Sequence, residues 1–148
     1  MLLQSGLGGA VGFVLGCGLA IIHKRRDPNV PNEVKVGEVV GDVRGKTCIL
    51  VDDMIDTGGT ITKAAELLFD NGATDVVVTA THGVLSGAAV DRLKNSRISE
   101  VVVTNTLPIE DERRFDKLTV LSIAPLLARA ISEVFEDGSV TSLFDGAA

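Results

Sequence analysis

The sequence predicts an α/β fold, an open and mainly parallel sheet flanked by helices. Two observations carry this prediction: short runs rich in β-branched residues recur along the chain, and segments with helical spacing lie between them. Strands that alternate with helices build parallel sheets with right-handed crossovers. The length of 148 residues, 45% of them hydrophobic, suits one modest core and therefore a single folded domain.

Four short apolar runs are expected to be strands that are buried on both faces of the sheet. They are Thr47–Val51, Asp75–Ala80, Glu100–Thr104 and Leu118–Ile123. An earlier segment, "LAIIHKRR" (residues 19–26), is interpreted as a further buried strand that runs into a basic loop.

Three helices are expected between and after these strands, at Thr60–Asn71, Ala88–Asn95 and Pro125–Phe135. The first carries a stripe of apolar residues at helical spacing, and Gly72 is suited to end it. Pro125 suits the first turn of the last helix.

The amino-terminal stretch Leu2–Ile22 has no charged residue and is followed by Lys24, Arg25 and Arg26. Its length alone would allow a membrane span with a positive flank, and its glycines at 8, 12 and 16 have the spacing of packed membrane helices. Because the run also contains Gln4, Ser5 and many glycines, it is only moderately apolar. A buried strand is favoured over a span, and both interpretations stay open.

Composition and charge argue against one class of partner and indicate a cellular compartment. The net charge of −6 and the absence of Trp and Tyr argue against a nucleic-acid partner, which needs clustered cations and stacking rings. Cys17 and Cys48 lie in apolar surroundings without the spacing of a zinc site. We therefore expect both to be core residues of a protein in a reducing compartment, the cytoplasm.

The segment "ILVDDMIDTGGTI" (residues 49–61) combines an apolar strand, three aspartates and a glycine turn. Its "DTGGT" turn, Asp56, Thr57, Gly58, Gly59 and Thr60, precedes a helix, where free backbone N–H groups and the helix dipole favour a phosphate. The glycines allow close approach of the backbone, and the threonines add hydroxyl donors.

Asp52 and Asp53 would repel a phosphate that touched them, so they fit better as acceptors for sugar hydroxyls or as partners of a divalent cation. A phosphate at one end and a diol at the other describe a ribose 5-phosphate. An acidic loop that merely caps a helix is the alternative. Two aspartates, a third at Asp56 and the strand-turn-helix context favour the binding site.

The same segment resembles the phosphoribosyl-diphosphate motif of type I phosphoribosyltransferases. The flanking segments "LAIIHKRR", "GDVRGKTCILVDD", "ATHGVLSGAAVDRL", "NSRISEVVVTNTLP" and "SVTSLF" are similar to the carboxyl-terminal domain of the ribose-phosphate pyrophosphokinase family. The resemblance runs from about residue 19 to residue 144. It implies a phosphoribosyltransferase-like domain at 19–148, preceded by an altered segment at 1–18 and incomplete at its amino end.

The resemblance implies a reaction in which the β,γ-diphosphoryl group of magnesium ATP is transferred to the 1-hydroxyl of ribose 5-phosphate. Asp56, Thr57, Gly58, Gly59 and Thr60 then correspond to the 5-phosphate loop, with Asp52 and Asp53 near the ribose hydroxyls. Lys24 and Arg26 match the catalytic cations, which stabilise charge on the transferred group. His82 is expected to have a structural or loop-positioning role.

The chain also departs from the family pattern. The family's diphosphate loop is altered to "SGLGGAVG" (residues 5–12), in which Gly6 and Leu7 offer no counterpart of the aspartate that binds magnesium. The nucleotide domain has no counterpart either. We therefore assign no metal ligand to this chain, although the family uses Mg²⁺, and expect ATP to bind only with a missing domain or partner subunit.

Three hypotheses stay open at this point. The first is an enzyme portion that is inactive in isolation. The second is a non-catalytic subunit that associates with a full-length synthetase or senses a phosphoribosyl ligand, and the third is a membrane-anchored domain. Family members assemble, so we expect a homo-oligomer or association with full-length subunits. The sequence could represent a fragment, an artefact of gene prediction or a paralogue.

Overall fold

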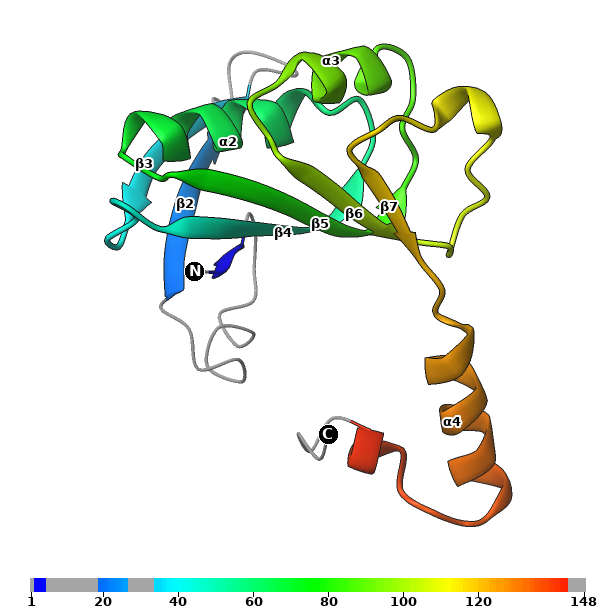
Figure 1. Ribbon diagram of the computed structural model, residues 1–148. Coiled ribbons are helices and arrows are strands. Elements are labelled where there is room, and N and C mark those ends of the chain that lie inside the picture. Colours follow the sequence, from blue (N-terminus) through cyan, green and yellow to red (C-terminus); the bar gives the residue numbers. More distant parts are fainter. Residues whose placement is uncertain (1, 5–18, 27–33, 144–148) are drawn as a thin grey trace.

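A computed structural model of the chain describes residues 2–4, 19–26 and 34–143 (Figure 1). The strands are β1 (Leu2–Gln4), β2 (Leu19–Arg26), β3 (Val34–Val40), β4 (Thr47–Ile55), β5 (Asp75–Gly83), β6 (Glu100–Thr104) and β7 (Leu118–Leu121). The α-helices are α2 (Gly59–Asp70), α3 (Ala89–Asn95) and α4 (Ala124–Phe135), and the 3₁₀ turns are η1 (Asp111–Arg113) and η2 (Val140–Leu143).

The described strands form one seven-stranded sheet in the order β3-β2-β1-β4-β5-β6-β7. All neighbouring strands are parallel except β2 and β3, which form an antiparallel pair. The strand order reverses where β1 lies between β2 and β4. In open α/β sheets, the carboxyl ends of strands at such a reversal are where ligands bind.

The core lies between the sheet and the two helices α2 and α3, which cover the same face (Figure 1). From α2 it takes Ile61, Ala64, Ala65 and Leu68, the stripe that the sequence predicts. From the sheet it takes alternate residues of β4, β5 and β6, such as Leu50, Val78 and Val103. Cys48 is fully buried here, and this burial raises the pKa of its thiol.

The prediction that the central strands are buried on both faces is wrong. In β4, β5 and β6 buried residues alternate with half-buried or exposed ones, so the described residues bury only one face of these strands. The physical reason is the placement of the helices. Both α2 and α3 cover one face, whereas α4 extends away beyond β7 (Figure 1).

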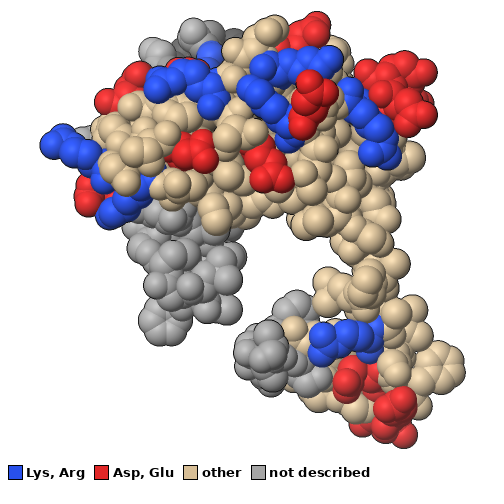
Figure 2. Space-filling view, viewed as in Figure 1, with Lys and Arg blue, Asp and Glu red and all other residues tan. Residues whose placement is uncertain are grey.

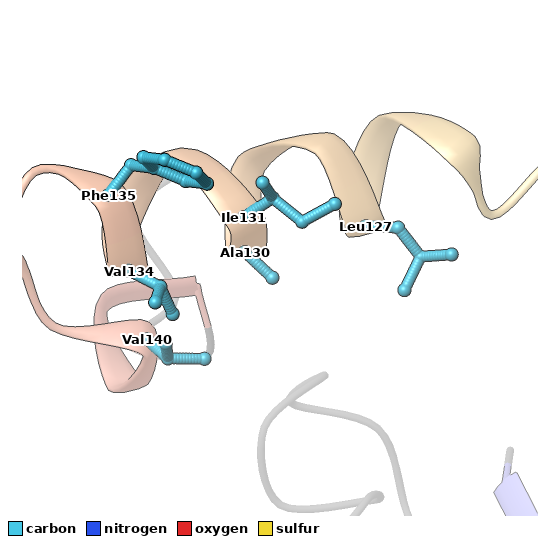
Figure 3. Close-up of a pocket in the computed structure, with 6 residues that line it drawn as sticks. All are labelled: Leu127, Ala130, Ile131, Val134, Phe135 and Val140. Carbon is cyan, nitrogen blue, oxygen red and sulfur yellow. The ribbon is translucent and has the colours of Figure 1, made fainter.

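Helix α4 leaves its apolar side uncovered. None of its residues is buried, and Phe135 is 86% exposed. Together with η2, the helix forms a shallow apolar hollow lined by Leu127, Ala130, Ile131, Val134, Phe135 and Val140 (Figure 3).

The predicted elements are otherwise confirmed with small shifts of their ends. Each expected helix starts within one residue of its predicted position, and Pro125 lies in the first turn of α4. The strands β4 and β5 run three to four residues further than predicted, whereas β3 has no counterpart among the predicted elements.

The predicted amino-terminal span lies mostly outside the described residues, as does Cys17. Among the helices that the structure describes, none combines the length and the apolar character that a membrane crossing needs.

Candidate functional site

The glycine turn lies between the end of β4 and the start of α2. Gly58 adopts a left-handed conformation, with φ of +73°, and precedes the first helical residue, Gly59. A side chain at Gly58 would be strained there, so glycine is the natural residue. Within the described part of the chain, no side chain caps the amino end of α2. The first N–H groups of the helix have no earlier carbonyl to bind, and this end therefore suits an anion.

The residues of the turn differ in how far they are exposed to solvent. Asp56 and Thr57 are exposed, Gly58 is buried, and Gly59 and Thr60 are half-buried. A Cβ atom at Gly59 would lie 3.8 Å from Thr57 Oγ1 and 3.9 Å from Arg92 Nη1, which are ordinary contacts. The chain itself therefore leaves room at Gly59, and this room is where a ligand could approach the backbone.

The aspartates that precede the turn lie inside β4 and not beyond it as predicted. The strand continues because β5 also continues, so that Met54 pairs with His82 and Ile55 with Gly83. Asp52 is half-buried and Asp53 is exposed. The backbone N–H of Asp53 donates to Asp52 Oδ1 over 3.0 Å, and that of Met54 donates to Asp53 Oδ1 over 2.8 Å. These bonds orient both carboxylates at the strand end.

The turn is held from behind by the segment that leads into α3. The backbone N–H groups of Leu85 and Ser86 donate to the carbonyls of Ile55 and Asp56, each over 3.0 Å. The Ser86 hydroxyl also donates to the Asp56 carboxylate. Asp56 is thereby fixed by a partner, and its side chain supports the turn.

Arg92 of α3 makes a further contact with the turn. Its Nη1 donates to the Thr57 carbonyl oxygen over 2.7 Å. A charged donor makes this bond stronger than a bond between neutral groups. Ser86 and Arg92 were both missed as site residues in the sequence, although "SGAAVDRL" places them six residues apart around the start of a helix.

The strand register brings the predicted cationic residues to the same edge of the sheet. Gln4 of β1 pairs with Ile21 of β2 on one side and with Val51 of β4 on the other. Ile21 and Val51 are therefore level with one another, and Lys24 and the aspartates follow them toward the carboxyl ends of their parallel strands. Two strand spacings separate β2 and β4, roughly 10 Å.

The basic residues extend a strand where the sequence predicts a loop. The antiparallel pairing with β3 matches Lys24 with Val36 and Arg26 with Val34, so β2 continues through Arg26. This pairing is the reason for the difference, since β3 supplies the hydrogen-bonding partner that a loop would lack. The altered loop at residues 5–12 lies outside the described residues.

His82 is tied to a cluster of threonine hydroxyls. Its Nδ1 lies 2.8 Å from Thr106 Oγ1, and the hydroxyls of Thr104 and Thr106 both donate to the Thr81 carbonyl, over 2.7 and 2.9 Å. The side chain is half-buried. This arrangement suits the structural role that the sequence suggests for His82.

The surface over α2 and α3 carries mixed charge. Figure 2 shows Lys and Arg side chains gathered over these helices, with Asp and Glu side chains between them. Among the described residues, no group of three or more His, Cys, Asp and Glu side chains is arranged to hold a metal ion.

Comparison with known proteins finds a matching family and several similar proteins. Residues 18–145 match the family described as the phosphoribosyl synthetase-associated domain. The ribose-phosphate pyrophosphokinase of Streptomyces coelicolor is 71% identical over 131 residues, and that of Mycobacterium tuberculosis is 63% identical over 131 residues. Each match covers 88% of this chain and 40% of the relative.

The crystal structure of phosphoribosylpyrophosphate synthetase from Mycobacterium smegmatis has the same fold over most of this chain. The TM-score is 0.76 at 53% sequence identity, and the match covers 93% of this chain and 46% of that one. The chain thus spans about 40% of the length of the curated relatives that it matches. With the family matched over residues 18–145, the chain belongs to the phosphoribosyl synthetase-associated domain family.

Proposed function

We propose that this chain binds ribose 5-phosphate at the carboxyl edge of β4. The turn Asp56–Thr60 would hold the 5-phosphate, and Asp52 and Asp53 would accept hydrogen bonds from the ribose hydroxyls. One observation carries the proposal: the amino end of α2, with Gly58 in a left-handed conformation and no side-chain cap, follows strand β4, whose second half contains the two oriented carboxylates of Asp52 and Asp53.

We further propose that the chain contributes to the reaction of a ribose-phosphate pyrophosphokinase. In that reaction the β,γ-diphosphoryl group of ATP passes to the 1-hydroxyl of ribose 5-phosphate, and AMP is released to give phosphoribosyl pyrophosphate for nucleotide biosynthesis. Lys24 and Arg26 would stabilise the negative charge on the transferred group. The names and the identities of the relatives support this proposal.

Magnesium enters this proposal only as the counterion of ATP. The described residues contain no group of three or more His, Cys, Asp and Glu side chains arranged around a metal, and Gly6 and Leu7 supply no carboxylate. We therefore derive no step from a metal held by this chain. ATP would bind only together with a further domain or a partner subunit.

The altered loop favours one alternative, a non-catalytic subunit that binds a phosphoribosyl ligand and associates with full-length synthetase. In either case we propose association with a second copy or with such a subunit, because α4 exposes apolar side chains such as Ile131 and Phe135. A cytoplasmic location fits the free, buried thiol of Cys48.

Calorimetry with three ligands tests the proposed binding. Ribose 5-phosphate should bind more tightly than either inorganic phosphate or ribose, because only it engages both halves of the site. The Asp52→Ala variant should weaken ribose 5-phosphate by about tenfold and leave inorganic phosphate unchanged, since the lost acceptor serves only the sugar. An equal loss for both ligands would show that Asp52 has a purely structural role.

A further inference from the structure

We propose that Arg92 is a positioning residue of the glycine turn, and that it acts by fixing the peptide unit between Thr57 and Gly58. This inference rests on the proposed function only for the identity of the ligand. The contact that carries it is the bond from Arg92 Nη1 to the Thr57 carbonyl oxygen, 2.7 Å long, which joins residues 35 positions apart in sequence.

This bond fixes the direction in which the Gly58 N–H points. In a trans peptide the C=O and the following N–H point in opposite directions. No peptide bond in the described residues is cis. Because Arg92 binds the Thr57 carbonyl oxygen, the Gly58 N–H points away from the guanidinium. The same bond offsets the partial negative charge of this oxygen, which would otherwise repel a phosphate.

The bond from Arg92 helps to select the left-handed conformation of Gly58. Glycine populates left-handed and right-handed conformations with similar ease, so the residue alone does not select one. Helix α3 packs against this residue, since a Cβ at Gly58 would lie at an ordinary contact distance of 3.6 Å from the Ala89 backbone. Arg92 fixes the preceding carbonyl from the same helix.

Helix α3 is itself anchored to the turn on its amino-terminal side, where Ser86 bonds to Asp56 through both backbone and hydroxyl. Arg92 is therefore attached to a rigid support and not to a free loop. Its Nη1 lies 3.9 Å from the position that a Cβ at Gly59 would take, so the guanidinium lies beside the first residue of α2. The turn is thus arranged for an anion before the anion arrives.

Arg97 offers a matched control. It is also an exposed arginine near α3, but it lies 3.9 Å from Glu66 and 4.0 Å from the Phe69 ring centroid, at the other end of the helix pair. Arg97→Met and Arg92→Met remove the same charge and leave similar side-chain volume. Only Arg92→Met removes the bond to the turn.

Two measurements test this inference: NMR resonances of the free protein and calorimetry with ribose 5-phosphate. In the free protein, Arg92→Met should shift the Thr57 carbonyl ¹³C and the Gly58 amide ¹⁵N resonances, Arg92→Lys should restore them in part, and Arg97→Met should leave them unchanged. In calorimetry, Arg92→Met should weaken ribose 5-phosphate by about tenfold or more, because a bond from a charged donor is lost. Arg97→Met should bind as the unchanged protein does.

The two readings separate this inference from the proposed function. Unmoved Thr57 and Gly58 resonances in Arg92→Met would overturn the positioning role, whatever happens to affinity. Moved resonances with unchanged affinity for ribose 5-phosphate would overturn it too. If the resonances move but the unchanged protein binds no ribose 5-phosphate, the fixed peptide unit is upheld and the ligand assignment fails.

Discussion

Gly58 and Gly59 are adjacent residues with different physical roles. Gly58 needs glycine because its φ is +73°, whereas Gly59 has ordinary helical geometry and room for a methyl group. The sequence motif alone assigns one role to both residues, namely close approach of a ligand. The structure divides these roles, so that Gly58 shapes the turn and Gly59 leaves space for a ligand.

Because the two glycines have different roles, replacing Gly58 should mainly affect stability, and replacing Gly59 should mainly affect ligand binding. Gly58→Ala should destabilise the protein by about 1–2 kcal/mol, because alanine is disfavoured in the left-handed region. Gly59→Ala should leave the unfolding free energy within about 1 kcal/mol and still weaken ribose 5-phosphate, since the methyl group occupies the approach side. Denaturant unfolding and calorimetry on both variants measure the two effects. Unchanged affinity in Gly59→Ala would place the ligand elsewhere.

Local sequence patterns predicted the strand-turn-helix context of the candidate site, whereas contacts between distant residues did not follow from them. Asp52, Gly58 and Thr60 stand in one local motif whose strand-turn-helix context can be inferred from neighbouring residues. Arg92 could not be inferred in this way, because its contact with Thr57 depends on how α3 packs against the turn. The predicted roles of Lys24 and Arg26 stay predictions, although the strand register brings their backbone to the expected edge.

At the scale of elements, the turn between β5 and α3 supports the site through an unusual residue. Leu85 is 2% exposed and has a φ of +50°, which non-glycine residues rarely adopt. Two bonds hold this conformation. The Leu85 N–H donates to the Ile55 carbonyl over 3.0 Å, and Arg113 Nη1 donates to the Val84 carbonyl over 2.9 Å. The core position of the side chain thus offsets the backbone strain.

Removal of this side chain should affect both stability and binding. Leu85→Ala should lower the unfolding free energy by roughly 2–5 kcal/mol, because it leaves a cavity without relieving the backbone. It should also weaken ribose 5-phosphate by loosening Ser86 from Asp56. Leu107→Ala, at a leucine that is 36% exposed, serves as the control and should change stability by about 0.5 kcal/mol or less. Equal losses in the two variants would contradict the supporting role.

Elements with a strong local hydrophobic pattern were predicted well from the sequence. Features that depend on packing between distant elements were predicted poorly. The stripe in α2 and the β-branched runs of β5 and β6 define these elements locally. The β3 segment "VKVGEVV" mixes charges and a glycine with its valines, so its alternation was weaker. The half-exposed second face of the sheet depends on the path of α4, which no local pattern encodes.

For the whole molecule, the exposed side of α4 predicts self-association. A large apolar surface without a cover is unfavourable in water, and burying it between subunits removes this cost. Ile131→Glu should therefore shift the sedimentation coefficient toward that of a monomer. Ala128→Glu adds the same charge at an exposed position outside the hollow and should not have this effect. A monomeric unchanged protein that also fails to bind a full-length synthetase would contradict the prediction.

Catalysis also depends on the whole molecule, because both substrates must be aligned with one another. Phosphoryl-group transfer depends on positioning and charge stabilisation, and this chain matches only about 40% of the length of its relatives. We expect the isolated 148-residue chain to release no AMP from magnesium ATP in the presence of ribose 5-phosphate. The Lys24→Ala variant controls for contaminating enzymes. Release that requires the sugar and disappears in Lys24→Ala would show that this chain suffices for the reaction.

An NMR titration of the ¹⁵N-labelled protein tests the claim that ribose 5-phosphate binds at the turn after β4. Ribose 5-phosphate should shift the amide resonances of Asp53, Thr57, Gly58, Gly59 and Thr60. Inorganic phosphate should shift only those of the turn, at higher concentration, and ribose alone should shift few. Unchanged turn resonances at saturating ribose 5-phosphate, or changes confined to another part of the protein, would contradict the claim.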